Sequence, residues 1–125
     1  MENLVASHLP DLYRLIQFHA HWGPTSDCGS EHTLDGKSYP AEIHFVFWNT
    51  IYKTYDNAIT HSDGLAVVGV FLKEGKYNPD YAYITSLISD AINTKRPVPI
   101  STTLDITKMI PLGQFFTRKC CLRDL

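Results

Sequence analysis

Two segments in the first half of the chain alternate apolar and polar residues with the period of a β-strand. The faces of residues 13–22 are Leu15, Gln17, His19 and His21 on one side and Ile16, Phe18 and Ala20 on the other. The faces of residues 39–48 are Glu42, His44, Val46 and Trp48 on one side and Ile43, Phe45 and Phe47 on the other. The pattern therefore predicts two strands, each with an apolar face and a face that carries histidine.

Further elements follow from the rest of the pattern. Residues 64–72 form a continuous apolar run that predicts a strand covered on both faces. A helix is expected to begin at Pro79, to end at residues 95–97 and to carry an apolar stripe. The stripe comprises Tyr81, Ile84, Leu87, Ile88, Ala91 and Ile92.

The remaining segments give weaker patterns. We expect a short strand over 30–34, a hairpin-type turn at Asp35–Gly36, a short helical segment within 49–60, and strand or loop over 98–110. Together these elements predict a mixed α/β, strand-dominated fold in a single domain over residues 1–125.

Composition narrows the classes of function. The chain has 125 residues and a formal net charge of −2, which gives no electrostatic basis for a nucleic-acid partner. No apolar run approaches the roughly 20 residues of a membrane-spanning helix, and the first residues lack the pattern of a signal peptide. Three cysteines, two of them adjacent, do not form a disulfide framework. We therefore expect a cytoplasmic monomer that has neither a nucleic-acid nor a membrane partner.

Histidine supplies the main candidate chemistry. His19 and His21 are separated by one residue and so share a strand face, while His44 lies in the second strand. Three imidazoles converging from adjacent strands are the ligand set of an open catalytic zinc site, in which water takes the fourth position. Gln17 and Glu42 lie two residues before a histidine on the same faces, where each can accept the second ring N–H. The alternative is that these histidines are hydrogen-bonded core or surface residues.

Four blocks of sequence resemble the α-class carbonic anhydrases in content, order and spacing. They are 17–23 (QFHAHWG), 29–33 (GSEHT), 41–49 (AEIHFVFWN) and 63–72 (DGLAVVGVFL). The resemblance implies a partial carbonic anhydrase fold around a central, mostly antiparallel twisted sheet. It also implies Zn²⁺ held by His19, His21 and His44, with a zinc-bound hydroxide that converts carbon dioxide reversibly to bicarbonate and a proton.

The same resemblance implies roles for other residues. Glu31 would belong to the hydrogen-bond chain that orients the hydroxide, and His32 would support that network, although a purely structural role for His32 is the simpler alternative. Gln17 and Glu42 would be partners of His19 and His44. Val46 and Val67 would line an apolar pocket for carbon dioxide, or else be ordinary core residues.

The resemblance covers about residues 13–116 and corresponds to the middle of the family's domain, while residues 118–125 diverge. We therefore expect a domain truncated at both ends, without the family's proton-shuttle histidine and threonine loop. The predicted function is that of a zinc-dependent carbonic anhydrase, a lyase. Two alternatives remain, a non-catalytic interaction module related to carbonic anhydrases and an inactive truncated product.

Overall fold

The computed structural model describes residues 2–100, 104–111 and 113–117 and has strands as its main elements. The strands are β1 (Asn3–Leu4), β2 (Tyr13–Trp22), β3 (Ala41–Asn49) and β4 (Leu65–Leu72). The helices are η1 (Thr50–Tyr52), α1 (Tyr55–Ala58), α2 (Pro79–Thr94) and η2 (Ile106–Lys108). The expected mixed α/β, strand-dominated fold is confirmed.

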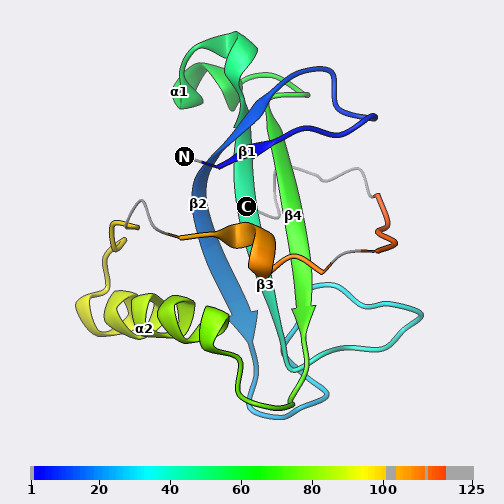
Figure 1. Cartoon of the computed structure of the whole chain (residues 1–125), viewed down its shortest axis with the longest axis vertical. Helices are drawn as coiled ribbons and strands as arrows, with labels where there is room; N and C mark the ends of the chain where they lie inside the picture. Colours follow the sequence, from blue (N-terminus) through cyan, green and yellow to red (C-terminus); the bar gives the residue numbers. More distant parts are fainter. Residues whose placement is uncertain (1, 101–103, 112, 118–125) are drawn as a thin grey trace.

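The four strands form one antiparallel sheet in the order β1-β2-β3-β4. Figure 1 shows the three long strands twisting side by side through the centre of the molecule. β3 lies between β2 and β4, and every residue from Glu42 to Asn49 is buried. Because successive side chains point to opposite faces, β3 contributes apolar residues to one face and Glu42 and His44 to the other.

The apolar face of the sheet carries the core. Phe45 and Phe47 are at most 1% exposed and belong to a buried cluster that includes Ile84 of α2 and Ile106 of η2. In Figure 1, η2 crosses in front of the strands and α2 lies beside the C-terminal half of β2. The core thus fixes the backbone of β2 and β3 from the side opposite the histidines.

A β-bulge interrupts the alternation of β2, so Leu15 lies on a different face of the strand than expected. Leu15 pairs with Phe47, whereas Gln17 pairs with Val46, so Ile16 is the extra residue. Residues directly opposite one another in an antiparallel pair share a face. Leu15 therefore packs against the core and does not share the face of Gln17, His19 and His21, as strict alternation predicted.

The helix α2 forms where the pattern placed it. Asn78 caps its first turn by accepting from the backbone N–H of Asp80, and Pro79 follows as the first helical residue. Lys95 ends it in a left-handed conformation with a φ of 53°. Of the expected apolar stripe, Ile84 is buried and Ile92 is 53% exposed.

The segment between β2 and β3 contains one expected element but not the other. Residues 30–34 are not a strand, because the backbone N–H of His32 donates to the Glu42 side chain and not to a neighbouring strand. The turn at Asp35–Gly36 is confirmed, with φ of 52° and 76° and paired backbone hydrogen bonds between Leu34 and Lys37.

The expectations for β4 and for residues 49–60 and 98–110 are confirmed in part. β4 is not covered on both faces, since Gly69 is exposed and Leu65 to Val68 are half-buried. The short helical segment expected within 49–60 is present as η1 and α1. Of the strand or loop expected over 98–110, the described part is loop together with η2. Residues 118–125 lie outside the described residues.

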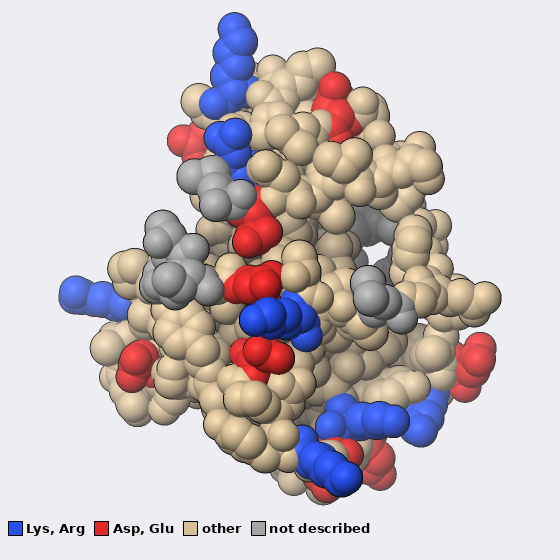
Figure 2. All heavy atoms as spheres, in the orientation of Figure 1, with Lys and Arg blue, Asp and Glu red and all other residues tan. Residues whose placement is uncertain are grey.

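The surface carries charges of both signs. On the face displayed in Figure 2, Lys and Arg side chains are interspersed with Asp and Glu among the described residues. This distribution agrees with the small net charge of −2. Among the helices of the described residues, none has the length and apolar character needed to cross a membrane.

The buried ring of Phe45 yields the first prediction. Phe45→Ala removes a fully buried side chain that packs beside Phe18, with ring centroids 6.1 Å apart. We expect the free energy of unfolding to fall by about 3–5 kcal/mol in urea denaturation, because the lost burial and the cavity both destabilise. Phe116→Ala is the matched control, since Phe116 is 80% exposed. Equal effects of the two substitutions would contradict this core.

Candidate metal centre

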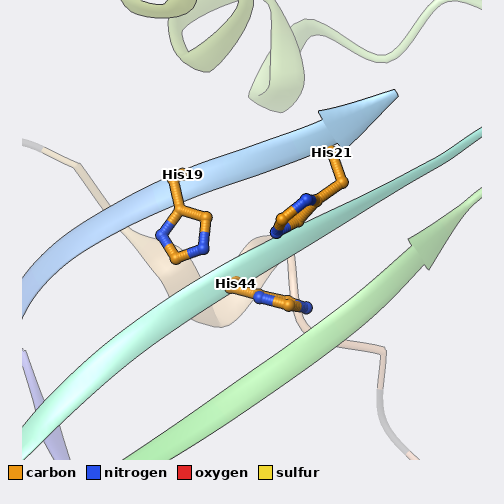
Figure 3. A group of neighbouring side chains, drawn as sticks. All are labelled: His19, His21 and His44. Carbon is orange, nitrogen blue, oxygen red and sulfur yellow. The ribbon is translucent and has the colours of Figure 1, made fainter. Parts of the chain in front are cut away.

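Three histidine rings converge on the face of the sheet opposite the core (Figure 3). His19 of β2 lies directly opposite His44 of β3, and His21 follows two residues later on the same face. The ring centroids are 5.1 Å apart for His19 and His44, 5.2 Å for His19 and His21, and 4.8 Å for His21 and His44. The expected pairing of adjacent histidine-bearing strands therefore brings all three imidazoles together.

Two neighbouring side chains determine which ring nitrogens remain available. The Oε1 atom of Gln17 lies 3.1 Å from Nδ1 of His19, which leaves Nε2 of His19 facing the cluster. The Oε1 atom of Glu42 lies 2.7 Å from Nε2 of His44. An acceptor at one ring nitrogen places the proton there and leaves the other nitrogen with a free lone pair.

The ring nitrogens without a hydrogen-bond partner are the ones that could bind a metal ion. Nε2 of His21 and Nδ1 of His44 are buried and have no hydrogen-bond partner among the described residues. A buried polar atom without a partner destabilises the protein unless a ligand satisfies it. One ligand atom from each of the three histidines lies within 4.8 Å of the others.

This arrangement fits a tetrahedral ion. Zinc–nitrogen bonds of about 2.0–2.1 Å separate the nitrogens of a tetrahedral site by about 3.4 Å. The three ligand atoms of the histidines lie within 4.8 Å of one another, a limit somewhat wider than this spacing. Three neutral nitrogen ligands leave a fourth position open, so the residues present can hold a metal ion and leave room for a reacting molecule.

The surroundings of His19 favour its neutral imidazole form. Burial, and then the neighbouring His44 and His21 rings, lower the pKa of His19. A lowered pKa keeps the ring deprotonated at neutral pH, which is the form that binds a metal ion.

Glu42 connects the histidine cluster to the loop that carries His32. Its Oε1 atom lies 2.7 Å from Nε2 of His44 and 2.8 Å from Nδ1 of His32, and its Oε2 accepts the backbone N–H of His32 at 2.9 Å. Burial raises the pKa of Glu42, but the hydrogen bonds from His32 and His44 outweigh it and lower the pKa overall. Glu42 is only 3% exposed, so an ionised carboxylate is held inside the protein by three donors.

The His32 side chain contacts Glu42 more closely than it contacts Glu31. Its Nδ1 lies 2.8 Å from Glu42 but 4.0 Å from Oε2 of Glu31. The contact with Glu42 had no signal in the sequence, because His32 precedes Glu42 by ten positions and lies in an irregular loop. Glu31, His32 and His44 also form a possible metal-binding group. Since Glu42 already engages Nδ1 of His32, the three-histidine group is the better fit.

Glu31 lies beside the unpaired nitrogens. Its Oε2 atom is 3.7 Å from Nε2 of His21 and 3.7 Å from Nδ1 of His44, and its side chain is 31% exposed. A carboxylate at this distance can accept hydrogen bonds from a molecule held at the open side of the cluster. The structure thus brings Glu31 to the three histidines.

Val46 and Val67 lie next to each other on the histidine side of the sheet. They are directly paired between β3 and β4, and Val46 is two residues beyond His44. Val46 is 1% exposed, whereas Val67 is half-buried. The two side chains therefore form an apolar region beside the cluster, in which Val67 is the more exposed of the two.

Comparison with known proteins identifies relatives for this sequence. The family model for eukaryotic-type carbonic anhydrases matches residues 2–122, which include the blocks described above. The chain is 42% identical over 120 residues to carbonic anhydrase 3 of Homo sapiens, with 90% of this chain and 46% of the relative covered. It is 49% identical over 116 residues to carbonic anhydrase 3 of Sus scrofa, with 86% and 44% covered. The chain therefore spans less than half the length of these relatives.

The charge on Glu42 yields a prediction for metal-free protein. A lowered pKa means that ionised Glu42 stabilises the fold above its ordinary pKa of 4.5 and that this contribution is lost as the pH falls through the lowered value. Glu42→Gln should reduce the free energy of unfolding at pH 7 by about 2–3 kcal/mol, because a charged acceptor is lost.

The difference between Glu42→Gln and wild type should shrink when urea denaturation is repeated well below pH 4.5. Glu74→Gln is the control, because Glu74 is exposed and accepts a hydrogen bond from the Ser26 hydroxyl. A difference that stays constant from neutral to acid pH would contradict the charged state of Glu42.

Proposed function

This chain belongs to the eukaryotic-type carbonic anhydrase family, and we propose that it binds Zn²⁺ and catalyses the reversible hydration of carbon dioxide to bicarbonate. The observation that carries the proposal is the pair of buried, unpartnered nitrogens, Nε2 of His21 and Nδ1 of His44. Together with His19 they form a three-nitrogen set with an open side. The relatives are carbonic anhydrase 3 proteins, which supports the same chemistry.

The histidines and their partners would hold the ion. A zinc ion bound by three neutral imidazoles lowers the pKa of a coordinated water to about 7 and so supplies hydroxide at neutral pH. Gln17 keeps the Nδ1 proton of His19, and Glu42 keeps the Nε2 proton of His44. Both acceptors thereby orient their rings and increase the basicity of the ligating nitrogen.

Glu31 and the two valines would position the reacting water and carbon dioxide. Oε2 of Glu31 lies 3.7 Å from the unpaired nitrogens of His21 and His44, where it would accept a hydrogen bond from the reacting water and orient it. Val46 and Val67 would receive carbon dioxide, because an apolar surface suits an apolar molecule that needs no hydrogen bonds. His32 would act through Glu42, to which it donates, and not on the reactants.

We also propose a cytoplasmic setting. Cys28 is free and exposed, as expected in a compartment that keeps thiols reduced. Carbon dioxide and bicarbonate would be the substrate and product, with no nucleic-acid or membrane partner, and the protein would act as a monomer.

Zinc content and carbon dioxide hydration of the purified protein test the function directly. Wild type should contain one zinc ion per chain and hydrate carbon dioxide. His44→Ala should lose both, because only two nitrogens of the set remain. His8→Ala is the matched control, since His8 is exposed and outside the cluster, and it should retain both.

The outcomes separate the alternatives. Stoichiometric zinc without hydration would favour a non-catalytic module over an enzyme. Absence of zinc in the wild type would reject the proposed centre.

Thermal unfolding tests whether the chain folds around its metal site. Zinc that binds only the folded state should stabilise it by about 2.7 kcal/mol when free zinc is 100 times the Kd. We therefore expect a cooperative transition whose Tm rises by several degrees on adding zinc and falls on chelation. His44→Ala should unfold cooperatively but respond little to zinc. A non-cooperative, zinc-insensitive transition in the wild type would instead indicate an inactive truncated product.

A further inference from the structure

Gly69 of β4 lies directly opposite His44 of β3 in the register of the sheet. We propose that Gly69 is a positioning residue for the metal centre: the absence of a side chain there leaves the space from which the Glu42 carboxylate holds the His44 ring. This inference rests on the proposed role of His44 as a metal ligand. It concerns a residue on a strand that contributes no metal ligand.

The argument begins with the space around the Gly69 Cα atom. A Cβ atom added at this position would lie 2.9 Å from Oε1 of Glu42, 3.5 Å from Cδ2 of His44 and 3.7 Å from Nε2 of His44. The two contacts with the ring are ordinary van der Waals distances. The contact with the carboxylate oxygen is too short, so an alanine at 69 requires Glu42 or the strand to move.

Glu42 cannot move freely. Its Oε1 atom serves both Nε2 of His44 at 2.7 Å and Nδ1 of His32 at 2.8 Å, while Oε2 accepts the backbone N–H of His32 at 2.9 Å. Any displacement away from Gly69 lengthens bonds to a buried charge that is only 3% exposed. Leaving a buried ionised group partly unsatisfied is unfavourable.

Neither the backbone conformation nor the core packing at position 69 requires a glycine. The glycines with positive φ in the described chain are Gly36 and Gly113, so Gly69 has a backbone conformation that any residue can adopt. It lies inside a strand of branched residues, where glycine is normally less stable than alanine. Gly69 is itself exposed and lies on the face opposite the core, so the core does not exclude a methyl group. The carboxylate of Glu42 is the one close obstacle.

The consequence for the centre follows from the hydrogen bond between Glu42 and His44. This bond keeps the proton on Nε2 and leaves Nδ1 free to bind a metal ion. When a methyl group displaces Oε1, the ring loses its fixed tautomer and orientation. We expect Gly69→Ala to weaken zinc binding by about 10- to 100-fold, the range typical for loss of such a partner.

Zinc titration against a competing chelator tests this in a double-mutant cycle. The four proteins are wild type, Gly69→Ala, Glu42→Ala and the double variant. If the methyl group acts through the carboxylate, Gly69→Ala should change the Kd by less than about threefold once Glu42 is alanine. Gly75→Ala is the matched control, because a Cβ there meets nothing within 4 Å, and it should leave the Kd unchanged. Additive effects of the two substitutions would overturn the proposal.

The same set of variants also shows whether a change in zinc binding results from loss of folding. If Gly69→Ala fails to unfold cooperatively but the double variant does so, the conflict with Glu42 is supported. If neither variant folds although Glu42→Ala alone does, the added methyl group conflicts with something other than Glu42 and the proposal is wrong.

A metal-free measurement separates this inference from the proposed function. Long-range ¹H–¹⁵N spectra at one mildly alkaline pH report which nitrogen of His44 carries the proton. Wild type and Gly75→Ala should show the Nε2–H form, and Gly69→Ala a mixture of both forms. Absence of zinc binding in the wild type would reject the proposed function and leave this test intact, whereas an unchanged His44 spectrum in Gly69→Ala would reject the role of Gly69.

Discussion

The structure depends on the antiparallel pairing of β2 with β3 in the register that sets His19 opposite His44. The alternation of apolar and polar residues selects this register, because a shift by one residue would turn the histidines of one strand to the other face. The apolar face stabilises the same register, because Phe45 and Phe47 must lie on the side covered by α2 and η2. Core packing and ligand placement are therefore two consequences of one pairing.

Glu42 extends that arrangement beyond the strands. A carboxylate that is 3% exposed is costly to bury, and here three donors from His32 and His44 compensate for it. The same contacts fix the loop that carries Glu31, so its Oε2 lies 3.7 Å from both unpaired nitrogens. The loop is irregular because its backbone satisfies the carboxylate and not a neighbouring strand.

The candidate centre occupies a compact part of the fold. All three histidines come from β2 and β3, and β4 contributes Val67 and the space at Gly69. The chain spans less than half the length of its carbonic anhydrase relatives, with 46% of the Homo sapiens protein covered, and this part contains the three-histidine group. Pairing of two strands is sufficient to bring the three histidines together.

The sequence by itself determined the three long strands, the helix from Pro79 and the three histidines, because alternation and helical periodicity are local properties of the chain. Their convergence followed from pairing two adjacent strands. Tertiary structure alone decided the bulge at Ile16, the bonding of His32 to Glu42 and the closeness of Gly69 to Glu42. These features depend on where separate strands and a loop meet in space. A pattern along one segment carries no information on contacts made across the sheet.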